Sequence, residues 1–215
     1  MGLCKLIKKV TTKIPGLKYQ PSFENSNWNK ADCLPEYNYY TEIMDLHDYT
    51  MYHGHPWTDA NNQILTSLCD YLITKFGDIN IMEIGVARDN PSSSTVLTNK
   101  ATKYFGIDLR DTSFIANNTN IFTLQASSFE QEKIRNFINH TPIHLLFIDG
   151  DHSIDTCLND WLYQDLVVKG GVIALHDTNH HPGPHTLFEA VNEWDYIKRR
   201  YCLHDYGIGV IEKIN

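Results

Sequence analysis

The sequence contains no CxxC pair and no uninterrupted apolar run long enough to span a bilayer. We expect no secretory signal, because lysines interrupt the apolar residues near position 1. Its five cysteines are an odd number and lie far apart, which favours reduced thiols over disulfides or a zinc site; they are Cys4, Cys33, Cys69, Cys157 and Cys202. With 215 residues, 42% of them apolar, the chain is expected to build one sizeable core and to be cytoplasmic.

Acidic residues are absent from the first 18 positions. That segment holds five of the 18 basic residues, so the remainder carries a charge of −13 although the whole chain carries −8. An acidic body is a poor platform for nucleic acid, whose binding depends on the neutralisation of phosphates. We therefore expect no nucleic-acid partner.

Residues 1–58 are predicted to form a basic helix followed by an aromatic-rich cap. Apolar residues recur at helical spacing from Leu3 to Ile14 with lysines on the opposite face, and Pro15 and Gly16 end the pattern. Such a helix can attach to an acidic membrane. The favoured interpretation is that it docks on its own domain or on a second subunit of a homo-oligomer. Residues 59–215 then form the main domain.

The stretch from Ile79 to Thr95 predicts a buried strand that ends in a glycine turn. Its apolar run up to Val86 is typical of a strand covered on both faces of a parallel sheet. Gly85 permits a tight turn where a Cβ would collide with a ligand, and the polar residues that follow favour a helix N-terminus. Together these features form the usual cradle for a nucleotide-like ligand at the carboxyl edge of an α/β sheet.

Strand and helix patterns alternate through the rest of the chain. Strands are expected at 103–109, 120–124, 143–148 and 171–175, helices at 58–76, 95–101 and 154–169, and two closing strands at 198–202 and 208–214. This order predicts a three-layer α/β/α sandwich around a Rossmann-like, mostly parallel seven-stranded sheet with an antiparallel C-terminal hairpin.

Asp108 ends the second predicted strand. It follows Gly85 by about twenty residues, the place where such folds bind both hydroxyls of a ribose with one carboxylate. The alternative is a simple helix cap, and the spacing favours the ribose role.

Polar residues also follow two further strands. The run Asp149–His152 comes directly after 143–148, and His176 and Asp177 come directly after 171–175. Neighbouring parallel strands would place the two aspartates side by side with histidines close by. Two carboxylates and an imidazole suit Mg²⁺ or Mn²⁺, and the imidazole also admits a transition metal. Alternatively, one carboxylate caps a helix and the other pairs with a histidine.

Six sequence segments together resemble the class I S-adenosylmethionine-dependent methyltransferases. They are MEIGVAR, YFGIDLRD, FIDGDHS with Asp160 downstream, VKGGVIALHDT, HPGPHTLFEAV and YGIGVIEK. The resemblance spans about Leu65 to Ile214 and points to the branch that includes macrocin O-methyltransferase and cephalosporin hydroxylase-like proteins. It implies an O-methyltransferase that acts on a hydroxyl of a small molecule, a sugar or another hydroxylated metabolite.

The resemblance also implies roles for individual residues. The cofactor would contact Glu83, Gly85 and Ala87 at its methionine end, Asp108 at its ribose, Ala126 and Ser127 at its adenine, and Asp149 at the strand end. Asp149, His176 and Asp177 match the positions that hold a divalent cation in the metal-dependent members. In such enzymes the cation binds the acceptor hydroxyl and lowers its pKa, and His152, His181 or His185 would take the proton.

Two departures from the family pattern affect this interpretation. The loop Asp89–Ser93 replaces the usual glycine-rich run, and His176 stands where many metal-dependent members have an acid. A metal-free mechanism is therefore the alternative, with His152 or His181 as the general base and Asp149 orienting it.

Two other functions compete with methyl transfer. One is a non-catalytic binding or assembly protein that keeps the fold and docks through its basic N-terminal helix. The other is an oxidoreductase, against which the missing GxGxxG motif argues, as do the polar strand ends that hydride transfer does not need.

Overall fold

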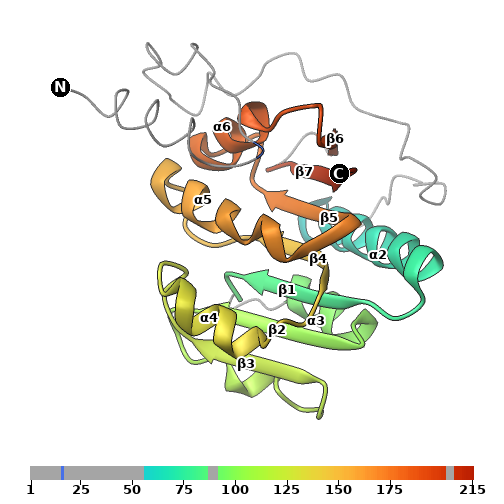
Figure 1. Ribbon diagram of the computed structural model, residues 1–215, viewed down its shortest axis with the longest axis vertical. Helices are drawn as coiled ribbons and strands as arrows, with labels where there is room; N and C mark the ends of the chain where they lie inside the picture. The colour runs from blue at the N-terminus through green and yellow to red at the C-terminus, as the bar shows by residue number, and fades with distance from the viewer. Residues whose placement is uncertain (1–15, 17–55, 87–91, 202–205) are drawn as a thin grey trace.

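The computed structural model describes Gly16 and residues 56–86, 92–201 and 206–215 (Figure 1). The predicted N-terminal helix, the aromatic-rich cap up to residue 55 and Ala87 lie outside the described residues. Within the part of the chain that is described, no helix combines the length and the apolar character that a membrane span requires.

A seven-stranded sheet forms the centre of the molecule, with the strand order β3-β2-β1-β4-β5-β7-β6. The strands are β1 (Asn80–Ile84), β2 (Lys103–Asp108), β3 (Ile121–Gln125), β4 (Ile143–Ile148), β5 (Val167–His176), β6 (Tyr196–Tyr201) and β7 (Ile208–Lys213). The first five strands pair in parallel, whereas β7 runs antiparallel to both β5 and β6. The predicted sheet and its antiparallel C-terminal hairpin are confirmed.

Helices cover both faces of this sheet, as Figure 1 shows. Residues of α2 (Pro56–Phe76) and α3 (Ser92–Lys100) pack in one apolar cluster, and residues of α4 (Gln131–Ile138), α5 (Ile154–Asp160) and α6 (Pro182–Ala190) pack in the other. Alternate residues of each central strand enter opposite clusters, so Met82 and Ile84 face one helix layer and Ile81 faces the other. The near-continuous apolar strands of the sequence follow from this burial on both faces.

The structure corrects one strand boundary. The sequence predicted a helix up to Lys169 and a strand from Gly171, but α5 ends at Asp160, a 3-10 helix covers Trp161–Leu166, and β5 already begins at Val167. The register between β4 and β5 shifts at this point, because Ile143 pairs with Val167 and Leu145 pairs with Val172. The Gly170-Gly171 pair, interpreted as a helix end, therefore belongs to a bulge inside the strand.

Gly85 brings the end of β1 against the end of β4. Its φ of +92° lies in the left-handed region, and a Cβ there would collide with the backbone oxygen of Asp149. The backbone N–H of Asp149 donates to the oxygen of Ile84 at 2.8 Å, which ties the two strand ends together. The glycine is thus required by the approach of two backbones.

Gly85→Ala is expected to lower the free energy of unfolding by at least about 2 kcal/mol, because it adds a collision to the strain of a positive φ. The matched control is Gly77→Ala, since Gly77 has a φ of +78° and no atom within 4 Å of the position of a Cβ. Urea denaturation of both variants measures the difference. Equal losses would show that the strand ends do not need to approach so closely.

The alternation along β1 turns Glu83 towards α3, on the side of the sheet opposite to Ile84. Only 1% of Glu83 is exposed, and its carboxyl accepts a hydrogen bond from the hydroxyl of Tyr104 on β2. Burial raises the pKa of Glu83 to about 8, against the opposing effect of hydrogen bonds from Tyr104 and Ser94. Glu83 therefore links β1 to Tyr104 of β2 on the face of the sheet that α3 covers.

Glu83→Gln is expected to flatten the dependence of stability on pH. The unfolded carboxyl loses its proton near its ordinary value of 4.5, whereas the folded one keeps it up to about pH 8. The native state binds more protons over this interval, so the free energy of unfolding of the wild type falls as the pH rises. Denaturation at pH 5 and pH 8 should show this fall in the wild type and a smaller one in the variant. An equal fall in the free energy of unfolding between pH 5 and pH 8 in both proteins would contradict the raised pKa of Glu83.

Candidate active site

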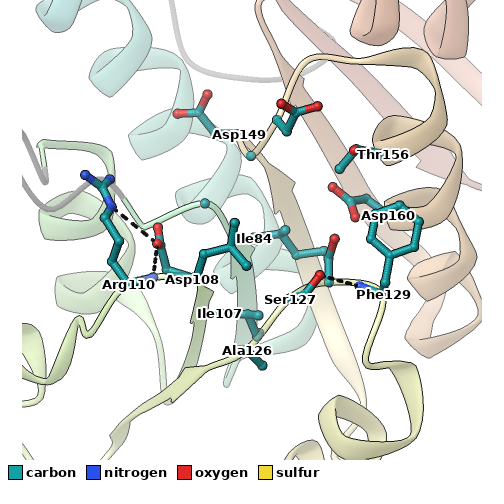
Figure 2. Close-up of a pocket in the computed structure, with 15 residues that line it drawn as sticks. Ile84, Ile107, Asp108, Arg110, Ala126, Ser127, Phe129, Asp149, Thr156 and Asp160 are labelled. Carbon is teal, nitrogen blue, oxygen red and sulfur yellow. Dashed lines mark hydrogen bonds and ion pairs between the residues drawn. The ribbon is translucent and has the colours of Figure 1, made fainter.

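A cavity of about 550 Å³ opens at the carboxyl edge of β1, β2, β3 and β4 (Figure 2). Of the residues predicted to contact a cofactor, those that line it are Gly85, Asp108, Ala126, Ser127 and Asp149. Glu83 does not line it, because its side chain lies on the other face of the sheet. The loops after four parallel strands thus meet at one edge, which is where ligands bind in open α/β sheets.

Asp108 is held in place by the loop that follows it. Its Oδ1 accepts a hydrogen bond from the backbone N–H of Arg110 at 2.8 Å, and the guanidinium of Arg110 lies 3.6 Å from the same oxygen. Figure 2 shows both contacts at the rim of the cavity. The next helical turn begins only at Ser113. Asp108 therefore closes a local turn and caps no helix, and its carboxylate faces the cavity.

Asp160 is a cavity residue that the sequence reasoning noted without assigning it a role. It is fully buried, and its Oδ2 has no hydrogen-bond partner among the described residues. Burial raises its pKa to about 6, against the effect of hydrogen bonds from Ser128 and Asn159. The available signal was an acid between Leu158 and Trp161 on the apolar side of a predicted helix. Other lining residues that were missed are Leu109, Arg110, Phe129 and Thr156.

Asp149, His176 and Asp177 meet beside this cavity, as the strand order predicted. The Nδ1 atom of His176 lies 2.9 Å from Oδ1 of Asp149 and 3.0 Å from Oδ1 of Asp177. The pairing of Ile148 with Leu175 places the next residue of each strand side by side. Asp149 also lines the cavity, so the cavity and this three-residue cluster share one carboxylate.

Two further histidines approach the other oxygen of Asp177. Oδ2 of this residue lies 3.0 Å from Nε2 of His152 and 3.7 Å from Nε2 of His181. The two imidazole rings stack with centroids 4.3 Å apart. His181 directly precedes α6, and His152 follows β4. His152 and His181, two of the predicted general bases, therefore belong to the same cluster as Asp177.

The charges of this cluster shift its pKa values strongly. Burial alone would lower the pKa of His176, but the carboxylates of Asp149 and Asp177 raise it to about 10. Burial opposes the ionisation of Asp149, yet the charges of His176 and His152 lower its pKa below its usual value. A positive charge between these carboxylates is therefore strongly favoured.

His185, the third histidine considered as a base, belongs to neither histidine-carboxylate group. Burial and the charge of Arg200 lower its pKa to about 4. It is therefore neutral near pH 7, and the bases that contact Asp177 are His152 and His181.

The donor atoms of the cluster fit a divalent cation. Three of its possible ligand atoms are buried and already face opposite charge within the cluster, namely Nε2 of His152, Nδ1 of His176 and Oδ1 of Asp177. Asp177 is 4% exposed and has a φ of +61°, which is uncommon for an aspartate and aims its carboxylate between the histidines. Adjacent ligands of an octahedral cation at about 2.1 Å lie about 3 Å apart, close to the distances found around Nδ1 of His176.

Comparison with known families identifies the part of the chain that holds this site. Residues 84–178 match the family model described as a methyltransferase domain. The matched segment contains Gly85, Asp108, Asp149, His176 and Asp177. No curated protein matches the chain.

Solved structures share the fold at low sequence identity. MycE methyltransferase from the mycinamycin biosynthetic pathway, in complex with Mg and SAH, is 15% identical with a TM-score of 0.50 over 68% of this chain and 48% of its own. A proposed caffeoyl-CoA O-methyltransferase from Staphylococcus aureus is 15% identical with a TM-score of 0.54 over 70% of this chain and 83% of its own. An rRNA methylase from Streptococcus thermophilus is 12% identical with a TM-score of 0.52 over 68% of this chain and 94% of its own.

The present chain thus spans about half the length of MycE. Identities this low establish the fold alone. The chain has the α/β fold of the class I methyltransferases, and its residues 84–178 match a methyltransferase domain.

Proposed function

We propose that the protein is an S-adenosylmethionine-dependent O-methyltransferase that acts on a hydroxyl of a small molecule, such as a sugar or another hydroxylated metabolite, next to a divalent cation. The observation that carries this proposal is the position of Asp149, which lines the cavity and also contacts His176 of the cation cluster. A methyl donor in the cavity and an acceptor at the cluster would lie on the two sides of one carboxylate.

The cavity supplies the contacts that the cofactor requires. Asp108 offers a carboxylate for two ribose hydroxyls, and Ala126 and Ser127 border the space for the adenine. Gly85 borders the same cavity at the end of β1. S-adenosylmethionine supplies the sulfonium methyl group that is transferred.

The cluster orients the acceptor and takes its proton. Asp149, His176 and Asp177 would hold Mg²⁺ or Mn²⁺, and the histidine nitrogen also suits a transition metal. A cation held by these residues would supply the Lewis acidity that lowers the pKa of an acceptor hydroxyl and would help to orient it. His152, whose Nε2 lies 3.0 Å from Asp177, accepts the proton, and His181 stacks on its ring. The acidic charge of the chain argues against a nucleic-acid substrate.

Asp108→Ala is expected to weaken binding of S-adenosylmethionine and of its demethylated product by about 10- to 100-fold, because hydrogen bonds to a charged group are lost. Calorimetric titration should give wild-type binding in the micromolar range, about −8 kcal/mol. The matched control is Asp111→Ala, which removes an exposed carboxylate outside the cavity lining. Unchanged affinity in the Asp108 variant would contradict the ribose role. Absence of binding in the wild type would favour the non-catalytic binding protein.

Asp177→Asn is expected to weaken binding of Mn²⁺ at least tenfold while binding of S-adenosylmethionine persists, because one anionic ligand becomes neutral. Asparagine tolerates a positive φ, so the backbone at this position is retained. Titration of chelated protein with Mn²⁺ measures the loss, and Asp165→Asn, an exposed change on the 3-10 helix, is the control. Metal-independent activity without any Mn²⁺ or Mg²⁺ heat would support the metal-free route through His152.

A further inference from the structure

Asn61 of α2 contacts the ring of His176 at Nε2, the nitrogen that faces away from the carboxylates. No role for Asn61 was predicted from the sequence. The side-chain nitrogen Nδ2 of Asn61 lies 2.8 Å from Nε2 of His176, across 115 positions of sequence. Asn61 is 8% exposed, and its side-chain oxygen, which faces away from the ring, has no hydrogen-bond partner among the described residues. The long helix α2 thus delivers one buried amide to the nitrogen of His176 that faces away from the carboxylates.

The two nitrogens of this ring have linked roles. Nδ1 faces Asp149 and Asp177 at about 3.0 Å. Two carboxylates repel a bare lone pair, so Nδ1 must either carry a proton or face a cation that lies between the three groups. In a neutral imidazole only one nitrogen carries the proton, and the partner of Nε2 therefore decides what Nδ1 offers.

The structure has Nδ2 towards the ring, and a half-turn of the amide exchanges nitrogen and oxygen while keeping the same outline. With the nitrogen towards the ring, Nε2 accepts a hydrogen bond, and Nδ1 carries a proton that blocks a cation. With the oxygen towards the ring, Nε2 donates whether or not Nδ1 also carries a proton, so a cation can replace the Nδ1 proton and face its lone pair between the carboxylates. Histidines that bind metals generally donate their second N–H to such an acceptor.

We propose that Asn61 is a positioning residue for the cation site. Its carbonyl oxygen accepts the Nε2–H of His176 and holds the ring in the tautomer whose Nδ1 faces Asp149 and Asp177 as a ligand. This inference rests on the cation of the proposed function. It gives α2 a role at the site through a contact with His176, the residue that departs from the acid found in many metal-dependent members of the family.

The test compares three variants of the full chain. Asn61→Asp keeps an acceptor and has no donor, whereas Asn61→Leu has neither. Asn62→Asp adds the same charge one position along the helix, on a different side, and serves as the control for a general electrostatic effect. Each protein is stripped with a chelator and titrated with Mn²⁺, and binding of S-adenosylmethionine is measured in parallel as evidence of an intact fold.

We expect Asn61→Leu to bind Mn²⁺ about 10- to 100-fold more weakly, as for other supporting groups of metal ligands. Asn61→Asp should bind at least as tightly as the wild type and more tightly than Asn62→Asp. The Zn²⁺-loaded wild type should also show the ring proton of His176 on Nε2 in nitrogen-15 NMR, a signature that a merely structural role would not produce.

Three results would overturn the inference, and they separate it from the proposed function. Equal Mn²⁺ affinity in Asn61→Leu and the wild type, or a ring proton on Nδ1 in the Zn²⁺-loaded protein, would remove the role of Asn61 and leave the cation site standing. Cofactor binding without any Mn²⁺ binding in the wild type would remove the cation site and Asn61 together, and methyl transfer would remain.

Discussion

The contact of Asp149 and Asp177 with one imidazole is the interaction on which the site depends. Two carboxylates so close together repel each other, and the desolvation of ions at a partly buried edge is costly. His176 lies 2.9 Å and 3.0 Å from them and offsets that cost when it carries a positive charge. A cation would offset it in the same place. The two carboxylates at this edge of the sheet therefore favour a positive charge between them. His152 and His181 lie close to the second oxygen of Asp177.

The two helix layers contribute to this edge in different ways. The layer of α2 and α3 covers Glu83 and supplies Asn61, which touches the back of the His176 ring. The opposite layer begins with the loops that carry His152 and His181 and contains Asp160, whose carboxyl borders the cavity. The site is thus assembled from both faces of the sheet, although the cavity itself opens at its edge. Asp149 connects the two parts because it belongs to the cavity lining and to the cluster.

Much of the fold could be predicted because its patterns are local. Apolar runs that end in glycine or acid indicated the parallel strands, and their order predicted Asp149 and Asp177 side by side with histidines close by. The register instead sets Asp149 opposite His176, one residue before Asp177. The bulge at Gly170-Gly171 could not be seen, because a glycine pair after a helical pattern looks like a helix end. Glu83 was assigned to the cofactor on family resemblance, whereas the alternation of side chains along β1 turns it to the other face. Asn61 carried no local signal that distinguishes a site residue from an ordinary helical one, and the acid of Asp160 among apolar neighbours was the only local sign of its place.

The sequence by itself determined which residues end the parallel strands, since that depends on hydrophobic periodicity and on short-range turn chemistry. It therefore determined that carboxylates and histidines would meet at one edge of the sheet. Only the tertiary structure decided which of these side chains are in contact, through which atoms, and which residues of the helix layers contact them in turn. The approach of Asn61 to His176 depends on how a helix packs across strands far away in sequence, and the burial that shifts each pKa exists only once that packing is complete.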